Sequence, residues 1–424
     1  PCAAVAAAHD GDVIEIDALG DYGGDVCAID KNGLTLRGVG GRAKIDAQGK
    51  NFGGKAIWVI TGHDTTVEGL EFSGATVPDQ NGAGIRQEGA NLSVRGCYFH
   101  DNDDGILTNA GANSQILIEY SEFARNGFGD GYSHNMYIGN VARFTLRYSY
   151  SHDAKVGHLV KSRAAENYIL YNRLSGETGS SSYELDLPNA GTSFVIGNLI
   201  EQGASTGNPS ILAYGEEGTA AGNPGHALYV VNNTFVNDRL SGGTFVNVGA
   251  AIDTPALLQN NAFAGPGTVA TQASAVLTAN FSGADPLFVD PSHFDYHLQP
   301  NSPCVDQGQA PSPVAGMALT PVSEYVHPAS MRSRVGVGVI DMGAYEFGAG
   351  NDTSSGGASG MSGASGATDS ASGATSDSNP ANGSGCACRA VPGSGVSPFG
   401  VLLLPAALLL RVRARARRRN KAQR

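Results

Sequence analysis

The sequence predicts an all-β fold, a right-handed single-stranded parallel β-helix (β-solenoid), and three observations lead to this prediction. Glycine is abundant, with 59 residues in 424, while only 16% of the residues are charged and a single one is Trp. Short strands of one type recur at a nearly regular spacing. Many of these strands end in Gly or Asn. A turn-rich composition with a repeat period of this length is typical of solenoids.

Residues 1–33 are predicted to form an N-terminal cap and the first strand. A short Ala-rich helix is expected over residues 3–8 and a strand over residues 13–16. We expect the sequence to begin within this cap, with further chain upstream. Cys2 and Cys27 have two interpretations: a disulfide across the first coil in an oxidising compartment, or two small buried hydrophobic residues.

Residues 34–284 hold the repeats, in which two sets of short strands alternate between Gly, Asn, Asp and Ser turns. Strands of the first set begin 24 to 34 residues apart, so each coil supplies at least two strands. The first set is LTLRG (34–38), TTVEG (65–69), LSVRG (92–96), ILIEY (116–120), FTLRY (144–148), YILYN (168–172), FVIGN (194–198), LYVVN (228–232) and ALLQN (256–260). The second set is GILTN (105–109), NMYIG (135–139), HLVKS (158–162), YELDL (183–187), ILAYG (211–215) and TFVNV (244–248).

The fifth position of the first strand set predicts a tight corner. Gly and Asn tolerate the left-handed backbone angles that such a corner requires. Stacked Asn side chains are also expected to hydrogen-bond from coil to coil. We expect the tyrosines at these positions to be packing residues. The residues are Gly38, Gly69, Gly96, Tyr120, Tyr148, Asn172, Asn198, Asn232 and Asn260.

These repeats resemble the pectin-lyase-like superfamily of right-handed parallel β-helices, over residues 13–348. Residues 285–348 are similar to a recurrent closing segment of such proteins, with the motifs DPLFVD (285–290), DYHLQPNSPCVDQG (295–308) and IDMGAYEFG (340–348). The resemblance implies that late strands and loops cap the exposed last coil, because an open strand edge invites aggregation.

The C-terminal residues form two further modules. Residues 349–385 are rich in Gly, Ser, Ala and Thr and predict a disordered linker. Residues 386–424 hold Cys386 and Cys388, an apolar run and an Arg cluster, which predict a hydrophobic helix. This order resembles the myxobacterial C-terminal sorting signal (MYXO-CTERM), which implies export and then anchoring in the membrane, or cleavage by a sorting protease, at the cell surface. The alternative is an ordinary transmembrane anchor.

The charge distribution restricts the partners. Residues 386–424 contain nine Lys and Arg and no acid, so residues 1–385 hold 18 basic against 39 acidic residues, a net charge of −21. An acidic body argues against nucleic acid as a partner, because phosphate contacts need basic surface. We expect a monomer.

Equivalent positions in neighbouring coils stack ~4.8 Å apart and form columns on one face. Aligning the second strands of three coils places Asn135, His158 and Glu184 in one outward column. Residues 136, 159 and 185 are then expected to point inward. Tyr137 and Asp186 fall in the next outward column, beside Val160. Beyond the strand ends lie Lys161, Arg163, Asn140 and Asn189.

The same stretch concentrates positive charge. Residues 141–175 hold a third of the basic residues of the acidic body, and four histidines are expected near them or one coil away. A basic groove that bears His and Tyr suits an extended acidic polysaccharide. The basic residues are Arg143, Arg147, Lys155, Lys161, Arg163 and Arg173, and the histidines are His100, His134, His152 and His158.

The chemistry that this groove predicts is β-elimination or epimerisation at a uronate. Arg163 or Lys161 neutralises the carboxylate, and His158 or Lys161 removes the adjacent proton. Tyr137 or His134 protonates the leaving oxygen, while Glu184 orients His158 or binds sugar hydroxyls. The predicted substrate-binding residues are Asn135, Asp186, Arg143 and Asn189.

Three alternatives stay open. A hydrolase of polygalacturonase type needs clustered acids, and its opening Asn-Thr-Asp element is absent. The run DNDD (101–104) resembles part of such a cluster, and its other interpretations are a solvated turn and a candidate calcium site. No other cofactor or metal is assigned. Lys161 and Arg163 are also placed to pair with Glu184, Asp186 or Glu166 across coils, in which case the protein is a non-catalytic adhesin or glycan-binding scaffold.

Overall fold

The computed structural model describes residues 1–220, 222–314, 316–348 and 389–391. The predicted linker, residues 349–385, lies outside the described residues, and so does the predicted hydrophobic helix of the tail. Within the described part of the chain, no helix is long and apolar enough to cross a membrane. The short strand β36 (Arg389–Val391) pairs antiparallel with β1 (Val13–Asp17).

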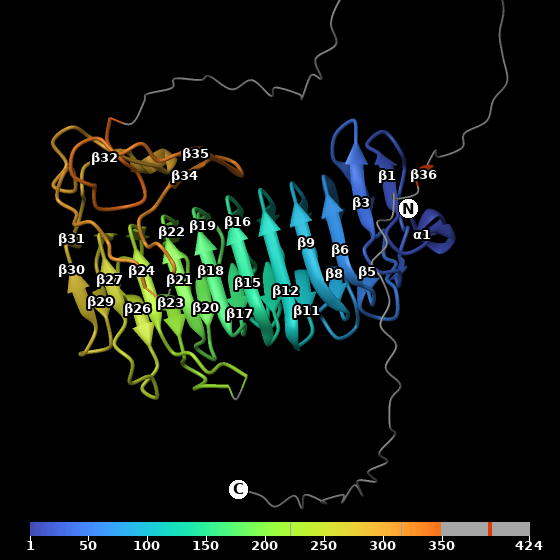
Figure 1. Ribbon diagram of the computed structural model, residues 1–424, viewed down its shortest axis with the longest axis horizontal. Helices are drawn as coiled ribbons and strands as arrows, with labels where there is room; N and C mark the ends of the chain where they lie inside the picture. Colours follow the sequence, from blue (N-terminus) through green and yellow to red (C-terminus); the bar gives the residue numbers. More distant parts are fainter. Residues whose placement is uncertain (221, 315, 349–388, 392–424) are drawn as a thin grey trace, which may run out of the picture. The chain divides into compact units, whose positions relative to one another are not determined.

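Residues 13–283 wind into a parallel solenoid with three sheets, which we call sheets A, B and C (Figure 1). In each coil the chain passes from sheet B to sheet A to sheet C, and then to sheet B of the next coil. Sheet A continues from β1 with β3 (Thr35–Val39), β6 (His63–Glu68), β9 (Ala90–Arg95), β12 (Gly111–Glu119), β15 (Val141–Arg147), β18 (Glu166–Leu170), β21 (Thr192–Ile196), β24 (Leu228–Val231), β27 (Leu257–Gln259) and β30 (Val276–Thr278).

Sheets B and C have ten strands each. Sheet B consists of β2 (Cys27–Ile29), β5 (Ala56–Ile60), β8 (Ala83–Gln87), β11 (Asp104–Thr108), β14 (Met136–Ile138), β17 (Val160–Ser162), β20 (Leu185–Leu187), β23 (Ser210–Tyr214), β26 (Thr244–Val248) and β29 (Thr268–Ala270). Sheet C consists of β4 (Ala43–Asp46), β7 (Leu70–Ser73), β10 (Tyr98–His100), β13 (Glu122–Ala124), β16 (Tyr150–His152), β19 (Arg173–Ser175), β22 (Leu199–Gln202), β25 (Thr234–Asn237), β28 (Ala262–Ala264) and β31 (Phe281–Gly283).

The predicted all-β parallel solenoid is confirmed. The two predicted strand sets are strands of sheets A and B, and sheet C is the additional one. Its strands have only three or four residues and follow closely on those of sheet A, as β10 follows β9 after two residues. Strands this short give no alternation of polar and apolar residues that a sequence pattern can reveal.

The interior is filled by side chains that stack from coil to coil. Phe72, Phe99 and Phe123 of sheet C are fully buried, and their ring centroids are 5.0 and 4.9 Å apart. Burying a side chain of this kind contributes about 1.5–3 kcal/mol. The regular stack fixes the register between coils, and thereby the relative heights of the outward-facing side chains.

An internal asparagine ladder runs along the corner between sheets A and C, and its side chains hydrogen-bond from coil to coil as predicted. Each Asn Nδ2 donates to the Oδ1 of the next Asn at 2.9–3.0 Å, along Asn172, Asn198, Asn233, Asn261 and Asn280. The predicted Asn232 and Asn260 lie outside this ladder and form a second pair between coils, in which Asn260 Nδ2 donates to Asn232 Oδ1 at 3.1 Å. These two take positive φ angles of 53° and 56°, as expected of a tight corner, and they also hydrogen-bond to the C-terminal segment.

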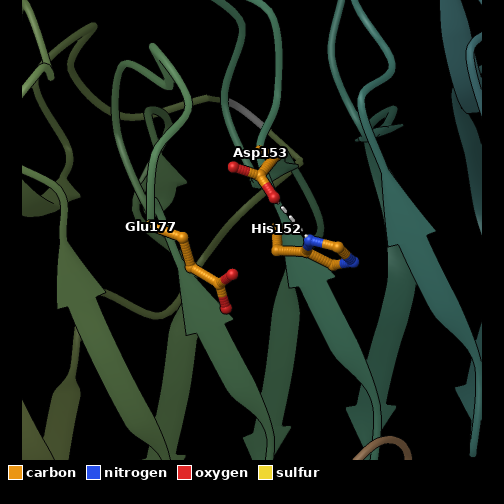
Figure 2. A group of neighbouring side chains, drawn as sticks. All are labelled: His152, Asp153 and Glu177. Carbon is orange, nitrogen blue, oxygen red and sulfur yellow. Dashed lines mark hydrogen bonds and ion pairs between the residues drawn. The ribbon is translucent and has the colours of Figure 1, made fainter. Parts of the chain in front are cut away.

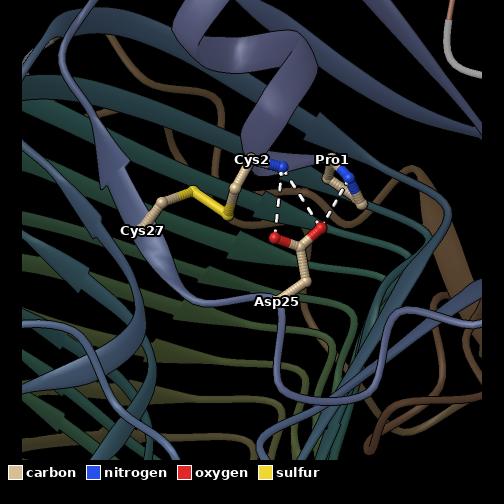
Figure 3. Close-up of a disulfide and its surroundings, with 4 residues drawn as sticks. All are labelled: Pro1, Cys2, Asp25 and Cys27. Atoms are coloured by element: carbon tan, nitrogen blue, oxygen red, sulfur yellow. Dashed lines mark hydrogen bonds and ion pairs between the residues drawn. A yellow bond between two sulfur atoms is a disulfide. The ribbon is translucent and has the colours of Figure 1, made fainter.

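The N-terminal end begins with the predicted short helix, α1 (Cys2–Ala7). A disulfide joins Cys2 to Cys27, which decides between the two interpretations of these cysteines (Figure 3). The Asp25 carboxylate accepts hydrogen bonds from the backbone N–H of Cys2 at 3.2 and 3.3 Å. Helix α1 is thus fixed to the first strand of sheet B.

The C-terminal segment, residues 285–348, lies along the side of the solenoid (Figure 1). It contains β32 (Phe288–Asp290), η1 (Pro291–His293), β33 (Asp295–Leu298), β34 (Ser323–Val326) and β35 (Ser330–Ser333). Its core side chains pack on the outer face of sheet C. It packs against Phe281 of the last coil but leaves Leu277 of that coil 54% exposed, although Leu277 pairs with the buried Leu258. Its role as a cap stays a prediction.

Candidate functional site

The outer face of sheet B carries the residues that the sequence singled out, in a register one residue different from the expected one. Tyr137 pairs with Lys161, and Lys161 pairs with Asp186, so these three form one outward column on β14, β17 and β20. The predicted position of Val160 beside Tyr137 is wrong, because Val160 is fully buried and faces inward.

Two predicted members of the outward column lie inside the solenoid. Asn135 is fully buried and donates to the backbone oxygen of His152 at 2.8 Å. Glu184 is also fully buried and accepts from Gln202 at 3.3 Å. The expectation that both face outward is wrong, since the chain bends just before each sheet B strand and two successive residues there turn inward. Burial raises the pKa of Glu184 well above its ordinary value.

Arg163 organises the polar contacts of this face. Its Nε donates to the Tyr137 hydroxyl oxygen at 2.8 Å, and Nη1 donates to the Asn189 side-chain oxygen. Nη1 and Nη2 also donate to the two carboxylate oxygens of Glu217, at 2.7 and 3.1 Å. The structure thus brings the predicted Tyr137, Arg163 and Asn189 together, and adds Glu217, which the sequence analysis did not identify.

Lys161 lies between two carboxylates. Its Nζ is 3.4 Å from Asp186 and 3.9 Å from Glu217. The same Nζ is 5.6 Å from the centroid of the Tyr137 ring. Burial raises the pKa of Asp186 to about 6, although the positive charge of Lys161 opposes that shift. One cation, one phenol and one carboxyl group with a pKa near neutrality therefore stand in a single column.

His134 and His158 stack at one end of this column, with ring centroids 4.4 Å apart. Nδ1 of His134 accepts from the backbone N–H of His158 at 3.0 Å, and Nδ1 of His158 accepts from that of Tyr183 at 3.3 Å. Nε2 of His158 lies 3.4 Å from Asp186. Burial, and then Lys161, lower the pKa of His158 to about 3. Both nitrogens of the neutral His158 ring are therefore occupied.

A pocket of about 460 Å³ opens beside Tyr137 and Arg163. It extends over the strands that precede β14, where Arg86 of β8 and Leu107 of β11 line it. Tyr132, in the loop before β14, also lines the pocket and is 85% exposed. An exposed aromatic ring at the rim of a polar pocket is a suitable stacking surface for a sugar ring.

The predicted single basic groove is wrong, because the six basic residues lie on different faces of a three-sided solenoid. Only Lys161 lies on a strand of sheet B, and Arg163 follows directly after that strand, β17. Arg143 and Arg147 are on sheet A, where Arg143 pairs with Glu166 at 2.7 Å. Arg143 therefore lies on a different face from the other predicted site residues. Lys155 pairs with Asp101, and Arg173 is on sheet C.

The DNDD run does not form a cluster of ligands. Asn102 faces the interior, where it hydrogen-bonds to Asn126, and Asp103 accepts from the backbone of Val77 and Gly82. Asp104 is buried and accepts from the backbone of His134 at 2.7 Å. Asp101 pairs with Arg125 at the surface. The four side chains are structural hydrogen-bond partners that point in different directions.

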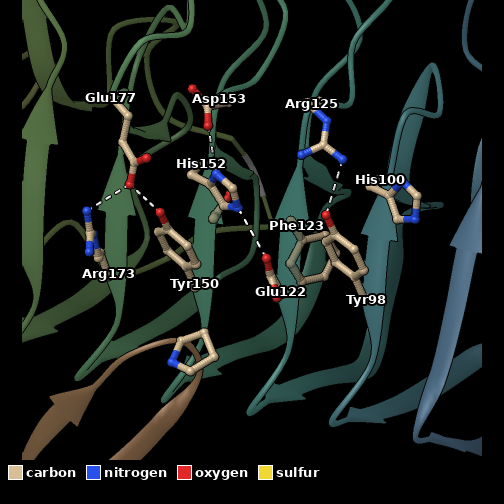
Figure 4. Close-up of polar contacts among 12 residues, drawn as sticks. Tyr98, His100, Glu122, Phe123, Arg125, Tyr150, His152, Asp153, Arg173 and Glu177 are labelled. Carbon is tan, nitrogen blue, oxygen red and sulfur yellow. Dashed lines mark hydrogen bonds and ion pairs between the residues drawn. The ribbon is translucent and has the colours of Figure 1, made fainter. Parts of the chain in front are cut away.

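Sheet C carries a second cluster of polar side chains, which the sequence analysis did not identify. Glu177 accepts from the Tyr150 hydroxyl and, at 2.8 Å, from Arg173 (Figure 4). These residues line a cleft of about 460 Å³ whose other wall is the C-terminal segment. The sequence gives no sign of this cleft, because Arg173 and Glu177 are more than 100 positions away from the C-terminal residues that form the other wall.

A neighbouring trio on the same face has ligand atoms within 4.8 Å of one another: His152, Asp153 and Glu177 (Figure 2). The His152 Nδ1 is 2.8 Å from Asp153, and its Nε2 is 3.4 Å from Glu122. Burial opposes protonation, but the two hydrogen-bonded carboxylates prevail and raise the pKa of His152.

Comparison with known proteins gives the same fold. Residues 32–183 match the family described as "Right handed beta helix region". The structure is similar to the crystal structure of pectate lyase Pel9A, with a TM-score of 0.50 and 16% sequence identity, over 81% of this chain and 90% of that chain. No curated protein sequence matches the chain. At this identity the likeness concerns the fold alone, and the described solenoid is a right-handed parallel β-helix.

Proposed function

We propose that this protein is a polysaccharide-active enzyme of the lyase or epimerase type, acting on a polymer that contains uronic acids. One observation carries the proposal: Tyr137, Lys161 and Arg163 lie together on the outer face of sheet B, and Arg163 donates to the Tyr137 oxygen at 2.8 Å. Two cations beside a phenol suit the removal of a proton next to a carboxylate.

Lys161 and Arg163 bind and neutralise the uronate carboxylate in this proposal. Neutralisation makes the proton on the carbon that bears the carboxylate easier to remove, because negative charge develops there in the transition state. Arg163 is held by Glu217 and Asn189, and Lys161 by Asp186, so both cations are oriented before substrate binds.

Tyr137 moves the proton. Acting as the phenolate, its oxygen takes the proton from the carbon that bears the carboxylate and becomes the phenol, and the released electron pair forms a double bond to the neighbouring carbon. The bond from that carbon to the glycosidic oxygen breaks, and Tyr137 returns the proton to this leaving oxygen. In epimerisation water instead gives the carbon a proton on its other face, and Tyr137 passes the abstracted proton back to water. His158 does not fit the role of base, since both of its ring nitrogens already have hydrogen-bond partners.

The comparison supports the class of substrate. The solved structure of similar fold is named a pectate lyase, and pectate is an acidic polysaccharide. The pocket beside Tyr137 has the size of a ligand site, and the exposed Tyr132 ring at its rim is placed to stack on a sugar.

The first test is a substrate screen. Wild-type protein is incubated with pectate, alginate and glycosaminoglycans, and the ultraviolet absorbance of unsaturated uronate ends is followed. We expect absorbance to increase on one polymer and not with Tyr137→Phe protein. Binding to these polymers without any new absorbance or change of sugar configuration would instead fit the non-catalytic glycan scaffold.

We further propose that the protein acts outside the cytoplasm, at the cell surface or in secreted form. The Cys2–Cys27 disulfide supports this, because such bonds persist in oxidising compartments. The Cys386–Arg419 stretch, which resembles a sorting signal, would then anchor the protein or be removed. Cell fractionation with the intact mass of the mature protein tests both points, and a full-length cytoplasmic protein would contradict them.

A further inference from the structure

The cleft between sheet C and the C-terminal segment has no part in the proposed reaction. Its volume of about 460 Å³ is that of a small-molecule site. Tyr150 and Arg173 belong to its sheet C wall, while Phe294, Tyr325 and Tyr345 come from the C-terminal segment. Four aromatic residues and an arginine thus line one open cleft.

Arg173 is the unusual residue of this cleft. Its side chain is 8% exposed, and its guanidinium carbon lies 5.0 Å from the centroid of the Tyr150 ring and 4.8 Å from that of Phe294. Nη2 donates to Glu177, but the buried Nε has no hydrogen-bond partner among the described residues. A buried N–H group without an acceptor costs about 1–3 kcal/mol.

The opposite wall presents a second cation. Arg332 of β35 donates to Glu324 at 2.7 Å and contacts His297 at 3.3 Å. Its guanidinium carbon is 6.0 Å from the centroid of the Tyr345 ring. Each wall therefore combines a guanidinium with an aromatic face. Aromatic faces favour stacking with a pyranose ring, and guanidinium groups favour a carboxylate.

We propose that this cleft binds a uronate unit of an acidic saccharide chain, at a second site separate from the one on sheet B. The ligand carboxylate pairs with the guanidinium of Arg173, which lines the cleft, while Glu177 keeps Nη2 in place. The inference rests on the proposed function only for the class of polymer. A second attachment point on neighbouring coils raises the local concentration of the polymer at sheet B.

The test separates the two sites by mutation of the full chain. The double variant Lys161→Ala, Arg163→Ala removes the sheet B cations, so that bound saccharides are not turned over. Calorimetric titration of this variant uses tetrasaccharides of galacturonate, guluronate, mannuronate and hyaluronan, with cellotetraose as the neutral control. We expect one acidic tetrasaccharide to bind with a stoichiometry of one, and cellotetraose not to bind.

Adding Arg173→Gln to this background should weaken binding at least about tenfold, since a hydrogen bond to a charged group is lost. Arg147→Gln is the matched control, because Arg147 also pairs with a glutamate and stacks on a tyrosine, but on sheet A. Arg332→Gln should weaken binding about threefold and decides the question if Arg173→Gln does not fold.

Two results would overturn this inference: no acidic tetrasaccharide binds to the sheet B double variant, or Arg332→Gln and a folded Arg173→Gln leave the affinity unchanged. The proposed function is judged separately by the ultraviolet product of wild-type protein. Elimination activity without binding in the double variant would refute the second site alone. Binding there with no activity in the wild type would refute the proposed reaction alone.

Discussion

The guanidinium of Arg163 donates a hydrogen bond of 2.8 Å to the phenol oxygen of Tyr137 from the neighbouring coil of sheet B. The two residues are 26 positions apart, so they are not neighbours in the sequence. The solenoid period brings them together, and the pairing of β14 with β17 sets their relative height. This contact places a cation at the atom to which the proposed reaction assigns proton transfer.

The first prediction concerns that phenol. Tyr137→Phe removes only the hydroxyl group and should lower kcat of elimination or epimerisation by about 10²–10⁴-fold, the range typical of a lost acid–base group. KM should change little, because Lys161 and Arg163 still bind the carboxylate. Tyr168→Phe on sheet A is the control, and an equal loss of kcat there would contradict the assignment.

A second prediction concerns Glu217, whose carboxylate occupies Arg163 and lies near Lys161. A substrate carboxylate must compete with it, and Glu217 is half-exposed, so the competition is modest. Glu217→Gln should therefore lower KM about two- to fivefold. The neighbouring Glu216→Gln, which contacts Tyr183 instead, should leave KM unchanged. A higher KM in Glu217→Gln would show that this residue supports substrate binding.

The pH dependence of stability follows from His158, whose pKa is about 3 in the folded protein because of burial and of Lys161. An unfolded histidine has a pKa of about 6.5, so the unfolded state binds the proton more tightly. His158 thus lowers the free energy of unfolding as the pH falls from about 6.5 towards 3. Urea unfolding of His158→Gln should show a flatter pH dependence across this window. His9→Gln, at an exposed position, should follow the wild-type curve.

The asparagine ladder gives a prediction about the fold. Asn198 accepts from the backbone and side chain of Asn172, and it donates to Asn233 and to the backbone oxygen of Ile169. Asn198→Ala leaves these buried groups without partners and should lower the free energy of unfolding by about 2–4 kcal/mol. Urea denaturation measures it. Asn247→Ala, on the outer face of sheet B, should cost far less, and equal costs would contradict the role of the ladder.

The fold was predictable because its signals are periodic. The spacing of the sheet A strands and the Gly and Asn corners both follow from the geometry of stacked coils. The site was predictable only in part. Tyr137, Lys161, Arg163, Asp186 and Asn189 do share a face, but the strict alternation assumed for β14 and β17 fails at the bend before each strand, where Asn135 and Leu159 both turn inward.

Contacts across the solenoid gave no sequence signal. Glu217 reaches Arg163 from a loop 54 positions later, and the C-terminal segment builds the cleft over Arg173 from more than 100 positions away. The predicted basic groove was wrong for a related reason. Lys155, Lys161 and Arg173 are close in sequence, but a coil with three sheets directs successive short strands towards different sides.

The account depends on removal of a proton from the carbon that bears the uronate carboxylate, and proton NMR in D₂O observes this directly. The polymer identified in the screen is incubated with protein, and the signal of that proton is followed. We predict that the signal disappears, through an unsaturated product or through deuterium incorporation, and that it persists with Lys161→Ala, Arg163→Ala protein. A signal that stays unchanged with wild-type protein, on a polymer that it binds, would contradict the account.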